Sequence, residues 1–197
     1  INFEEHQHSE TIILKADLVV KSPGIPDHVY IIKQLVEHQV LMISEIEFAS
    51  QYTEGTIIGV TGSNGKTTTT LITNHLLKAA NFNVGLAGNI GNSFAQQVSE
   101  QNFDSYVIEL SSFQLDGIIN FRPHIAIITN ISPDHLDRYE YDFNNYVASK
   151  FRITKNQTAE DFLIYDEDDT TINEWIKNNT INAQLIPFSL HKEVNVG

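Results

Sequence analysis

The feature that most constrains the fold of this chain is a strand, a glycine-rich loop and a helix in direct succession. Residues 56–61 form a β-branched, apolar run typical of a buried strand, residues 62–65 contain two glycines, and residues 66–80 carry leucine and isoleucine at helical spacing. A helix that directly follows a strand carries the chain back across the sheet, so that the next strand pairs in parallel. This segment predicts an α/β fold.

Strand-like and helix-like runs alternate along the rest of the chain. The runs at 106–110 and 125–130 are almost continuously apolar, as expected of central strands covered on both faces. We therefore predict a P-loop-type, mostly parallel sheet flanked by helices, with ligands at the carboxyl ends of its strands. Further strands are expected at 11–14, 18–20, 39–43, 83–87, 162–165 and 184–188, and further helices at 29–37, 44–52, 143–154 and 171–178.

Composition and charge exclude several classes of protein. The 197 residues include 12 Lys and Arg against 25 Asp and Glu, and the net charge of −13 argues against broad binding to nucleic acid or to an anionic membrane. The absence of cysteine excludes a disulfide framework, thiol catalysis and cysteine-ligated metal. No apolar run reaches the roughly 18 residues of a membrane helix. We expect a cytoplasmic, monomeric protein with no nucleic-acid or membrane partner.

The loop "GSNGKTT" at residues 62–68 has the properties of a phosphate-binding site. Its backbone N–H groups can surround an anion, and the following helix adds the partial positive charge of its N-terminus. Lys66 would then reach the β- and γ-phosphates of a nucleotide, and the Thr67 hydroxyl would hold Mg²⁺. Val60 stands where the generic P-loop pattern has its first glycine, so the prediction rests on residues 62–67. The alternative is a plain glycine turn before a helix.

Two later strand ends and one helix add candidate ligands. Glu109 closes a buried-type strand, and a carboxylate there suits Mg²⁺, although a solvated acid is the alternative. Its neighbours Ser111 and Ser112 could equally cap the next helix. In the loop "NISPDHLDRY", His135 could ligate a metal or contact an anion, although a lone loop histidine usually does neither. Lys150 lies in a predicted helix, where its pattern alone indicates a solvent-exposed lysine.

Five motifs taken together resemble the Mur ligases of bacterial cell-wall synthesis. They are "SPGIP", "GSNGKTT", "GNIG", "ELSSFQLD" and "NISPDHLDRY". The resemblance extends from about residue 10 to at least residue 165 and so covers most of the chain. The phosphate loop alone is shared with folylpolyglutamate synthases, whereas the other motifs most closely resemble the Mur ligases that add D-glutamate to UDP-N-acetylmuramoyl-L-alanine.

The resemblance implies roles for the matching residues. The loop would bind ATP, Thr67 and Glu109 would hold one Mg²⁺, and His135 would hold a second Mg²⁺ together with a carbamate on Lys150. Carbamylation requires a neutral amine, so the site must lower the pKa of this lysine from about 10.4. The implied catalytic residues are Lys66, His135 and Lys150. The implied ATP-binding residues are Gly62, Ser63, Asn64, Gly65, Lys66, Thr67 and Thr68, and the implied substrate contacts are Ser22, Pro23, Gly24, Asn89, Ser111 and Asn130.

The implied reaction is ATP-dependent amide-bond formation through an acyl phosphate, with UDP-N-acetylmuramoyl-L-alanine, D-glutamate and ATP as substrates. Residues 1–48 would be the C-terminal part of a smaller Rossmann-like domain that binds the UDP substrate. Residues 49–197 would be an incomplete central ATP-binding domain, and the C-terminal domain would be absent. We therefore expect a fragment that is inactive alone. The alternatives are another ligase of the Mur and folylpolyglutamate synthase superfamily, or a P-loop nucleotide-binding module without ligase chemistry.

Overall fold

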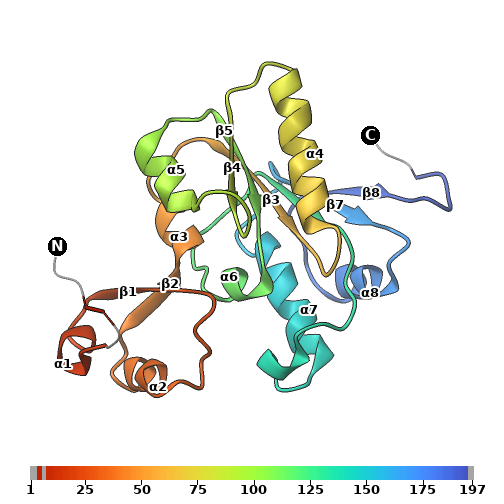
Figure 1. Cartoon of the computed structure of the whole chain (residues 1–197). Coiled ribbons are helices and arrows are strands. Elements are labelled where there is room, and N and C mark those ends of the chain that lie inside the picture. The colour runs from red at the N-terminus through yellow and green to blue at the C-terminus, as the bar shows by residue number, and fades with distance from the viewer. Residues whose placement is uncertain (1–3, 6–7, 195–197) are drawn as a thin grey trace.

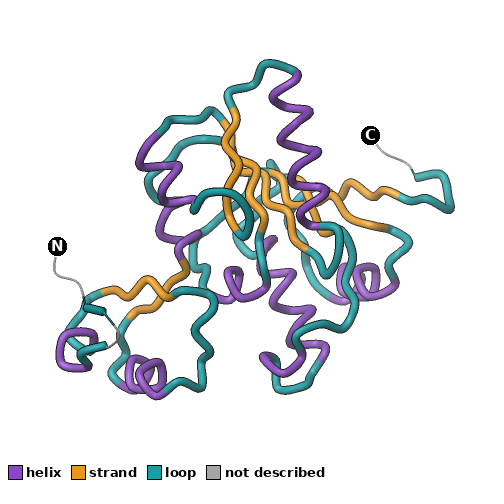
Figure 2. The backbone as a smooth tube through the Cα atoms, viewed as in Figure 1, coloured by secondary structure: helices purple, strands orange, loops and turns teal. Residues whose placement is uncertain are grey.

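The computed structural model describes residues 4–5 and 8–194 and contains two parallel sheets (Figure 1). The larger sheet has the strand order β4-β5-β3-β6-β7-β8, and the smaller sheet pairs β1 with β2. Figure 2 shows the smaller sheet apart from the larger one, toward the N-terminus. The strands are β1 (Leu18–Lys21), β2 (Leu41–Ser44), β3 (Thr56–Thr61), β4 (Val84–Gly88), β5 (Ser105–Glu109), β6 (Ile125–Ile128), β7 (Phe162–Asp166) and β8 (Gln184–Phe188). The helices are α1 (Glu10–Ile13), α2 (Tyr30–Glu37), α3 (Glu45–Ser50), α4 (Lys66–Ala79), α5 (Phe94–Glu100), α6 (Ser112–Asp116), α7 (Phe143–Phe151) and α8 (Thr170–Asn178), with 3₁₀ turns η1 (Leu136–Arg138) and η2 (Arg152–Thr154).

The central strands of the larger sheet are apolar because helices and loops cover both of their faces. All five residues of β5 are buried, and so is β3 from Ile57 onward. Helix α4 packs against β3, β4 and β5. A core cluster of buried side chains, among them Tyr106, Ile128 and Phe151, joins the strands to α7. The predicted parallel α/β fold, with its continuous apolar strands, is confirmed.

The order of the strands brings three loops together at one edge of the sheet. Strand β3 lies between β5 and β6, and both pairings are parallel. The chain first builds β4 and β5 on one side of β3 and then crosses to the other side to build β6. In such a sheet the loops on either side of the reversal separate and leave a crevice at the carboxyl ends of the strands. The loops after β3, β5 and β6 carry the polar motifs of the sequence, so these motifs meet at that crevice.

The N-terminal unit, residues 8–44, is joined to the larger sheet through α3 and the segment after α6. Glu47 of α3 is buried, and its carboxylate accepts the backbone N–H groups of residues 119–121 at 2.7–3.0 Å. Ser44 N–H donates to the Gly117 carbonyl at 2.9 Å. A Cβ on Gly117 would lie 2.7 Å from Ser44 N, so this close approach requires glycine. These contacts hold α3 and the end of β2 against the segment that follows α6.

Some local predictions differ from the structure. The strand predicted at 11–14 is wrong, because this segment forms α1, in which Ile12 and Ile13 N–H donate to the Ser9 carbonyl. In the described chain β1 pairs only with β2, so a strand at 11–14 would lack a partner, whereas a helical turn satisfies its backbone groups locally. The helix predicted at 143–154 ends as an α-helix at Phe151 and continues as η2. Among the described residues, no helix is long and apolar enough to cross a membrane.

Candidate active site

Two glycines shape the loop between β3 and α4. Gly62 and Gly65 have φ values of +141° and +78°, which residues with a side chain rarely adopt. A Cβ on Gly62 would also lie only 2.0 Å from Thr129 Oγ1. The same Thr129 hydroxyl donates to the Asn64 carbonyl at 2.7 Å. The loop is therefore packed tightly against the segment that follows β6.

Asn130 holds the loop in place from that segment. Its side-chain amide accepts the N–H of Asn64 and donates to the Asn64 carbonyl, both at 2.9 Å, and its backbone carbonyl accepts the N–H of Ser63 at 2.9 Å. Two of the N–H groups expected to surround an anion are thus used within the protein. Gly65 and the first turn of α4 remain to supply anion-binding N–H groups, because a helix leaves these without intrahelical partners.

The positive charge of the loop comes from Lys66. Its Nζ donates to the carbonyls of Gly62 and Ser63 at 3.0 and 2.9 Å, so the ammonium lies against the loop itself. Thr67 and Thr68 are exposed in the first turn of α4. The Ser63 hydroxyl faces inward and donates to Ser132 O at 2.8 Å. A charged amine, a helix N-terminus and exposed hydroxyls are the groups that a nucleotide phosphate requires.

Glu109 is buried, and the interpretation of a solvated strand-end acid is wrong. The residue is 1% exposed and pairs in register with Val60, so it lies beside the end of β3. Its Oε1 accepts a hydrogen bond from Asn89 Nδ2 at 2.9 Å, whereas its Oε2 is buried with no hydrogen-bond partner among the described residues. An unpaired buried carboxylate oxygen is costly, and a bound cation would remove that cost.

The carboxylate of Glu109 is close to Asn89 because the chain turns sharply after β4. Gly88 has a φ of +102°, and a Cβ there would lie 2.2 Å from the Glu109 carbonyl. Asn89 N–H donates to that carbonyl at 2.9 Å. On the other side of Glu109, Ser111 caps α6 in a capping box with Gln114. The capping role considered for the serines is therefore confirmed for Ser111.

His135 lies in a strained turn of the loop after β6. It adopts a left-handed conformation with φ of +50°, its imidazole is exposed, and its Nε2 is 3.6 Å from an Asp134 carboxylate oxygen. The ring packs against Phe113 of α6, with 5.5 Å between centroids. Non-glycine residues in this conformation are often found at functional sites. His135 lines the same cavity as Lys66.

Lys150 is buried, and the surface-lysine interpretation from its helical pattern is wrong. The residue is 2% exposed, and its Nζ donates to the Gly62 carbonyl at 2.8 Å and lies 4.9 Å from the centre of the Tyr146 ring. Burial, reinforced by the charge of Lys66, lowers the pKa of Lys150 to about 7. Tyr146 and Lys150 are four residues apart and so lie on one face of α7, which packs inward.

A cavity of about 280 Å³ brings these residues together. Seven of the residues predicted to form the site line it, from the ends of four strands (β3, β4, β5 and β6), from α7 and from the N-terminal unit. Sequence reasoning missed four further lining residues, of which Tyr146 could have been found from its spacing to Lys150. Predicted residues that do not line the cavity include Ser22, Glu109 and Asn130. The lining residues are Pro23, Gly24, Lys66, Asn89, Ser111, Ser112, Phe113, Asp134, His135, Tyr146 and Lys150.

The described residues offer a sparse set of metal donors. Within residues 4–5 and 8–194, no group of three or more histidine and acidic side chains forms a ready-made metal site. Glu109 supplies one unpaired oxygen, and His135 supplies one nitrogen to the cavity wall. An unmodified Lys150 offers no anionic ligand, and Mg²⁺ needs few protein oxygens because it keeps several waters.

Comparison with known proteins shows the family and the fold of the chain. Residues 60–196 match the family described as the Mur ligase middle domain. The chain is 55% identical over 197 residues to the UDP-N-acetylmuramoylalanine–D-glutamate ligase of Christiangramia forsetii, and the match covers 100% of the chain and 44% of that protein. The chain therefore spans less than half the length of this curated relative.

Two solved structures share the fold. One is the UDP-N-acetylmuramate:L-alanyl-gamma-D-glutamyl-meso-diaminopimelate ligase from Neisseria meningitides, with a TM-score of 0.62 and 18% identity over 87% of this chain and 58% of that chain. The other is a MurF ligase from Thermotoga maritima in complex with ADP, with a TM-score of 0.59 and 19% identity over 89% of this chain and 47% of that chain.

Proposed function

This chain belongs to the Mur ligase middle-domain family, and we propose that its complete protein joins D-glutamate to UDP-N-acetylmuramoyl-L-alanine at the expense of ATP. The observation that carries the proposal is the cavity in which Lys66, His135 and the buried Lys150 meet at the carboxyl edge of the sheet. The 55% identity over the whole chain to a ligase with this name supports the choice of substrates. Residues 1–48 would contribute to the UDP-substrate domain and residues 49–197 to the ATP-binding domain.

ATP would bind with its phosphates at residues 62–68. The N-terminus of α4 and the Lys66 ammonium supply positive charge where negative charge develops during phosphoryl transfer. Bound Mg²⁺ would neutralise further phosphate charge and orient the transferring group. Thr67 and the unpaired Oε2 of Glu109 would hold one ion, because Glu109 pairs in register with the strand that leads into the loop.

Lys150 would act as a carbamate at the second metal position, beside His135. With a pKa of about 7, a large fraction of its amine is neutral at physiological pH. The neutral nitrogen can attack CO₂, forming an N–C bond and releasing one proton to solvent. The product is an anion near Lys66. The positive charge of Lys66 lowers the pKa of the Lys150 amine, and the same charge would stabilise the carbamate. Burial of the lysine therefore favours the modification that the site requires.

The substrate carboxylate would attack the γ-phosphate of ATP to give an acyl phosphate and ADP. The D-glutamate amine would then displace phosphate and form the amide bond. Pro23, Gly24, Asn89 and Ser111 line the same cavity as Lys66, which supports their predicted contacts with the UDP substrate. None of the chain's side chains has to form a covalent intermediate. The cytoplasmic location and monomeric state stay predictions.

The test is phosphate release by the complete protein, measured with each substrate omitted in turn. We expect release to require both UDP-N-acetylmuramoyl-L-alanine and D-glutamate. Lys66→Ala should lower kcat by about a thousandfold, because charge aimed at a transferring phosphoryl group contributes several kcal/mol. Arg122→Lys, at the opposite edge of the sheet, is the control. Release that needs a folate substrate, or no second substrate at all, would support the two rival interpretations instead.

A further inference from the structure

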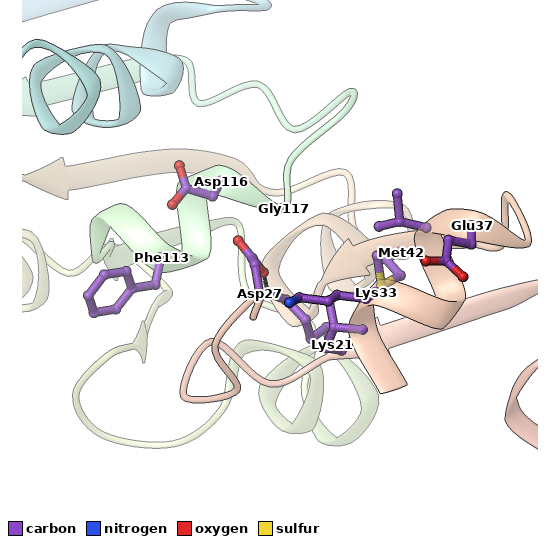
Figure 3. A pocket seen from close by; sticks show the side chains of 10 residues that line it. Lys21, Asp27, Lys33, Glu37, Met42, Phe113, Asp116 and Gly117 are labelled. Atoms are coloured by element: carbon purple, nitrogen blue, oxygen red, sulfur yellow. Dashed lines mark hydrogen bonds and ion pairs between the residues drawn. The ribbon is translucent and has the colours of Figure 1, made fainter. Parts of the chain in front are cut away.

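The loop at residues 22–25, which supplies Pro23 and Gly24 to the cavity, belongs to a part of the molecule that is loosely joined to the rest. A second cavity of about 540 Å³ separates α2 from α6. Figure 3 shows Phe113 and Asp116 of α6 on one side of it and Lys21 and Asp27 of the N-terminal unit on the other. Such an opening leaves little packing to fix residues 22–25 against the larger sheet.

One hydrogen bond crosses this boundary at the substrate side. Arg138 Nη2 donates to the Pro23 carbonyl at 3.4 Å. Among the residues that the structure describes, it is the only hydrogen bond that links residues 8–43 to residues 56–194. The other polar contacts of the boundary, made by Ser44, Glu45 and Glu47, lie at α3 and not at the cavity.

Arg138 is itself held by the residues around His135. Its guanidinium carbon lies 4.3 Å from the centre of the Phe113 ring, and its backbone N–H donates to the His135 carbonyl at 3.0 Å. Phe113 also stacks on Tyr139 and contacts the imidazole of His135, with centroids 6.0 and 5.5 Å apart. A planar guanidinium can stack on an aromatic ring and donate in its own plane at the same time, which an ammonium cannot do.

We infer that Arg138 is a positioning residue that holds the 22–25 loop against the His135 turn and so sets the substrate-side wall of the cavity. The inference rests on the proposed function, because it assumes that Pro23 and Gly24 contact the UDP substrate. Arg138 is absent from the cavity lining, so it would act through Pro23 and Phe113 rather than by touching the substrate. Among the described residues no hydrogen bond joins Arg138 to the loop at 62–68, so ATP binding should be independent of Arg138.

The experiment compares steady-state kinetics of the complete wild-type protein, Arg138→Ala and Arg138→Lys. We expect Arg138→Ala to raise KM for UDP-N-acetylmuramoyl-L-alanine about tenfold, with KM for ATP changed less than twofold. Arg138→Lys should resemble Arg138→Ala, because lysine keeps the charge but cannot stack and bridge. Arg122→Lys, which changes an arginine at the far edge of the sheet, should leave both constants unchanged.

A double-mutant cycle locates the effect. The cycle measures how much Phe113→Leu raises KM for the UDP substrate in two backgrounds, wild type and Arg138→Ala. Because Arg138 acts through the Phe113 ring, this rise should be smaller in the Arg138→Ala background than in wild type. An equal rise of both KM values, or an active Arg138→Lys with normal KM, would overturn the positioning role while leaving the ligase proposal intact. If the wild-type protein shows no turnover that depends on the UDP substrate, the ligase proposal itself fails.

Discussion

The two edges of the larger sheet each contain a buried charge, and the surroundings of these charges are opposite. At the carboxyl edge, the Lys150 ammonium donates a hydrogen bond to the Gly62 carbonyl and lies over the face of the Tyr146 ring. The nearby charge of Lys66 repels this ammonium. At the amino edge, Asp161 is 1% exposed and accepts hydrogen bonds from Arg122, His124 and the backbone of Thr158.

The pKa values follow this difference. Burial alone would raise the pKa of Asp161, but the hydrogen bonds from Arg122, Thr158 and His124 outweigh it and lower the pKa to about 2. Burial and a like charge lower the pKa of Lys150 to about 7. Asp161 is held in its charged form, whereas Lys150 is pushed toward its neutral form. Removing one partner of a paired buried charge destabilises the fold, whereas a buried charge that lacks a charged partner is a candidate functional group.

The largest effect expected concerns activity at the carboxyl edge. In the complete protein, Lys150→Ala should lower kcat by about a thousandfold or more, because the proposed carbamate at the second metal position would be lost. Acetate should restore part of this activity by filling the space beside His135. Lys150→Arg should not restore it, since a guanidinium keeps its charge and cannot be carbamylated. An active Lys150→Arg enzyme would contradict the carbamate.

At the amino edge, the expected effect is on stability. Asp161→Asn should lower the free energy of unfolding by about 2 kcal/mol, because the charge-assisted hydrogen bonds from Arg122 and the Thr158 backbone to the buried carboxylate are weakened. Urea denaturation measures the change, and kcat of the folded enzyme should stay within twofold of wild type. In wild type, the contribution of Asp161 is complete above the unfolded pKa of 3.8 and disappears as the pH falls toward 2. A variant as stable as wild type at pH 7 would show that this cluster is not structural.

The pH dependence of Lys150 should have the same direction as that of Asp161 but should fall in a higher pH range. Its folded pKa of about 7 lies below its unfolded value of 10.5, so the unfolded state binds more protons between these limits and wild-type stability rises with pH. Lys150→Met should remove this rise, so its stability relative to wild type should fall by about 2 kcal/mol between pH 7 and 9 in CO₂-depleted buffer. Parallel pH profiles for the two proteins would mean that Lys150 is not destabilised by burial.

The smallest effect is expected at His124, which is the more replaceable partner of Asp161. Its side chain is 45% exposed, and its Nδ1 lies 3.0 Å from Asp161 Oδ1. His124→Gln should cost about 0.5 kcal/mol in urea denaturation, because an exposed partner contributes little and Arg122 remains. A loss as large as that of Asp161→Asn would show that the imidazole, and not the guanidinium, holds the carboxylate.

The sequence by itself determined the parallel α/β fold and which polar residues follow the ends of its strands. A strand, two glycines and a helix that begins with Lys66 leave few alternatives to a phosphate loop, because backbone conformation at glycine is a local property. The apolar runs of β3, β5 and β6 are also local patterns. Their carboxyl ends had to meet once the strands were parallel.

Only the tertiary structure decided which polar residues are buried and what they contact. The pattern of its helix predicts that Lys150 is a surface residue. It is buried because α7 packs against the loop at Gly62, 88 positions earlier in the chain. Asn130 holds the phosphate loop and Arg138 reaches Pro23 for the same reason. These contacts join segments that are distant in the sequence. Secondary-structure propensity and hydrophobic periodicity describe only neighbours along the chain, whereas the burial and the pKa of a side chain depend on the whole fold.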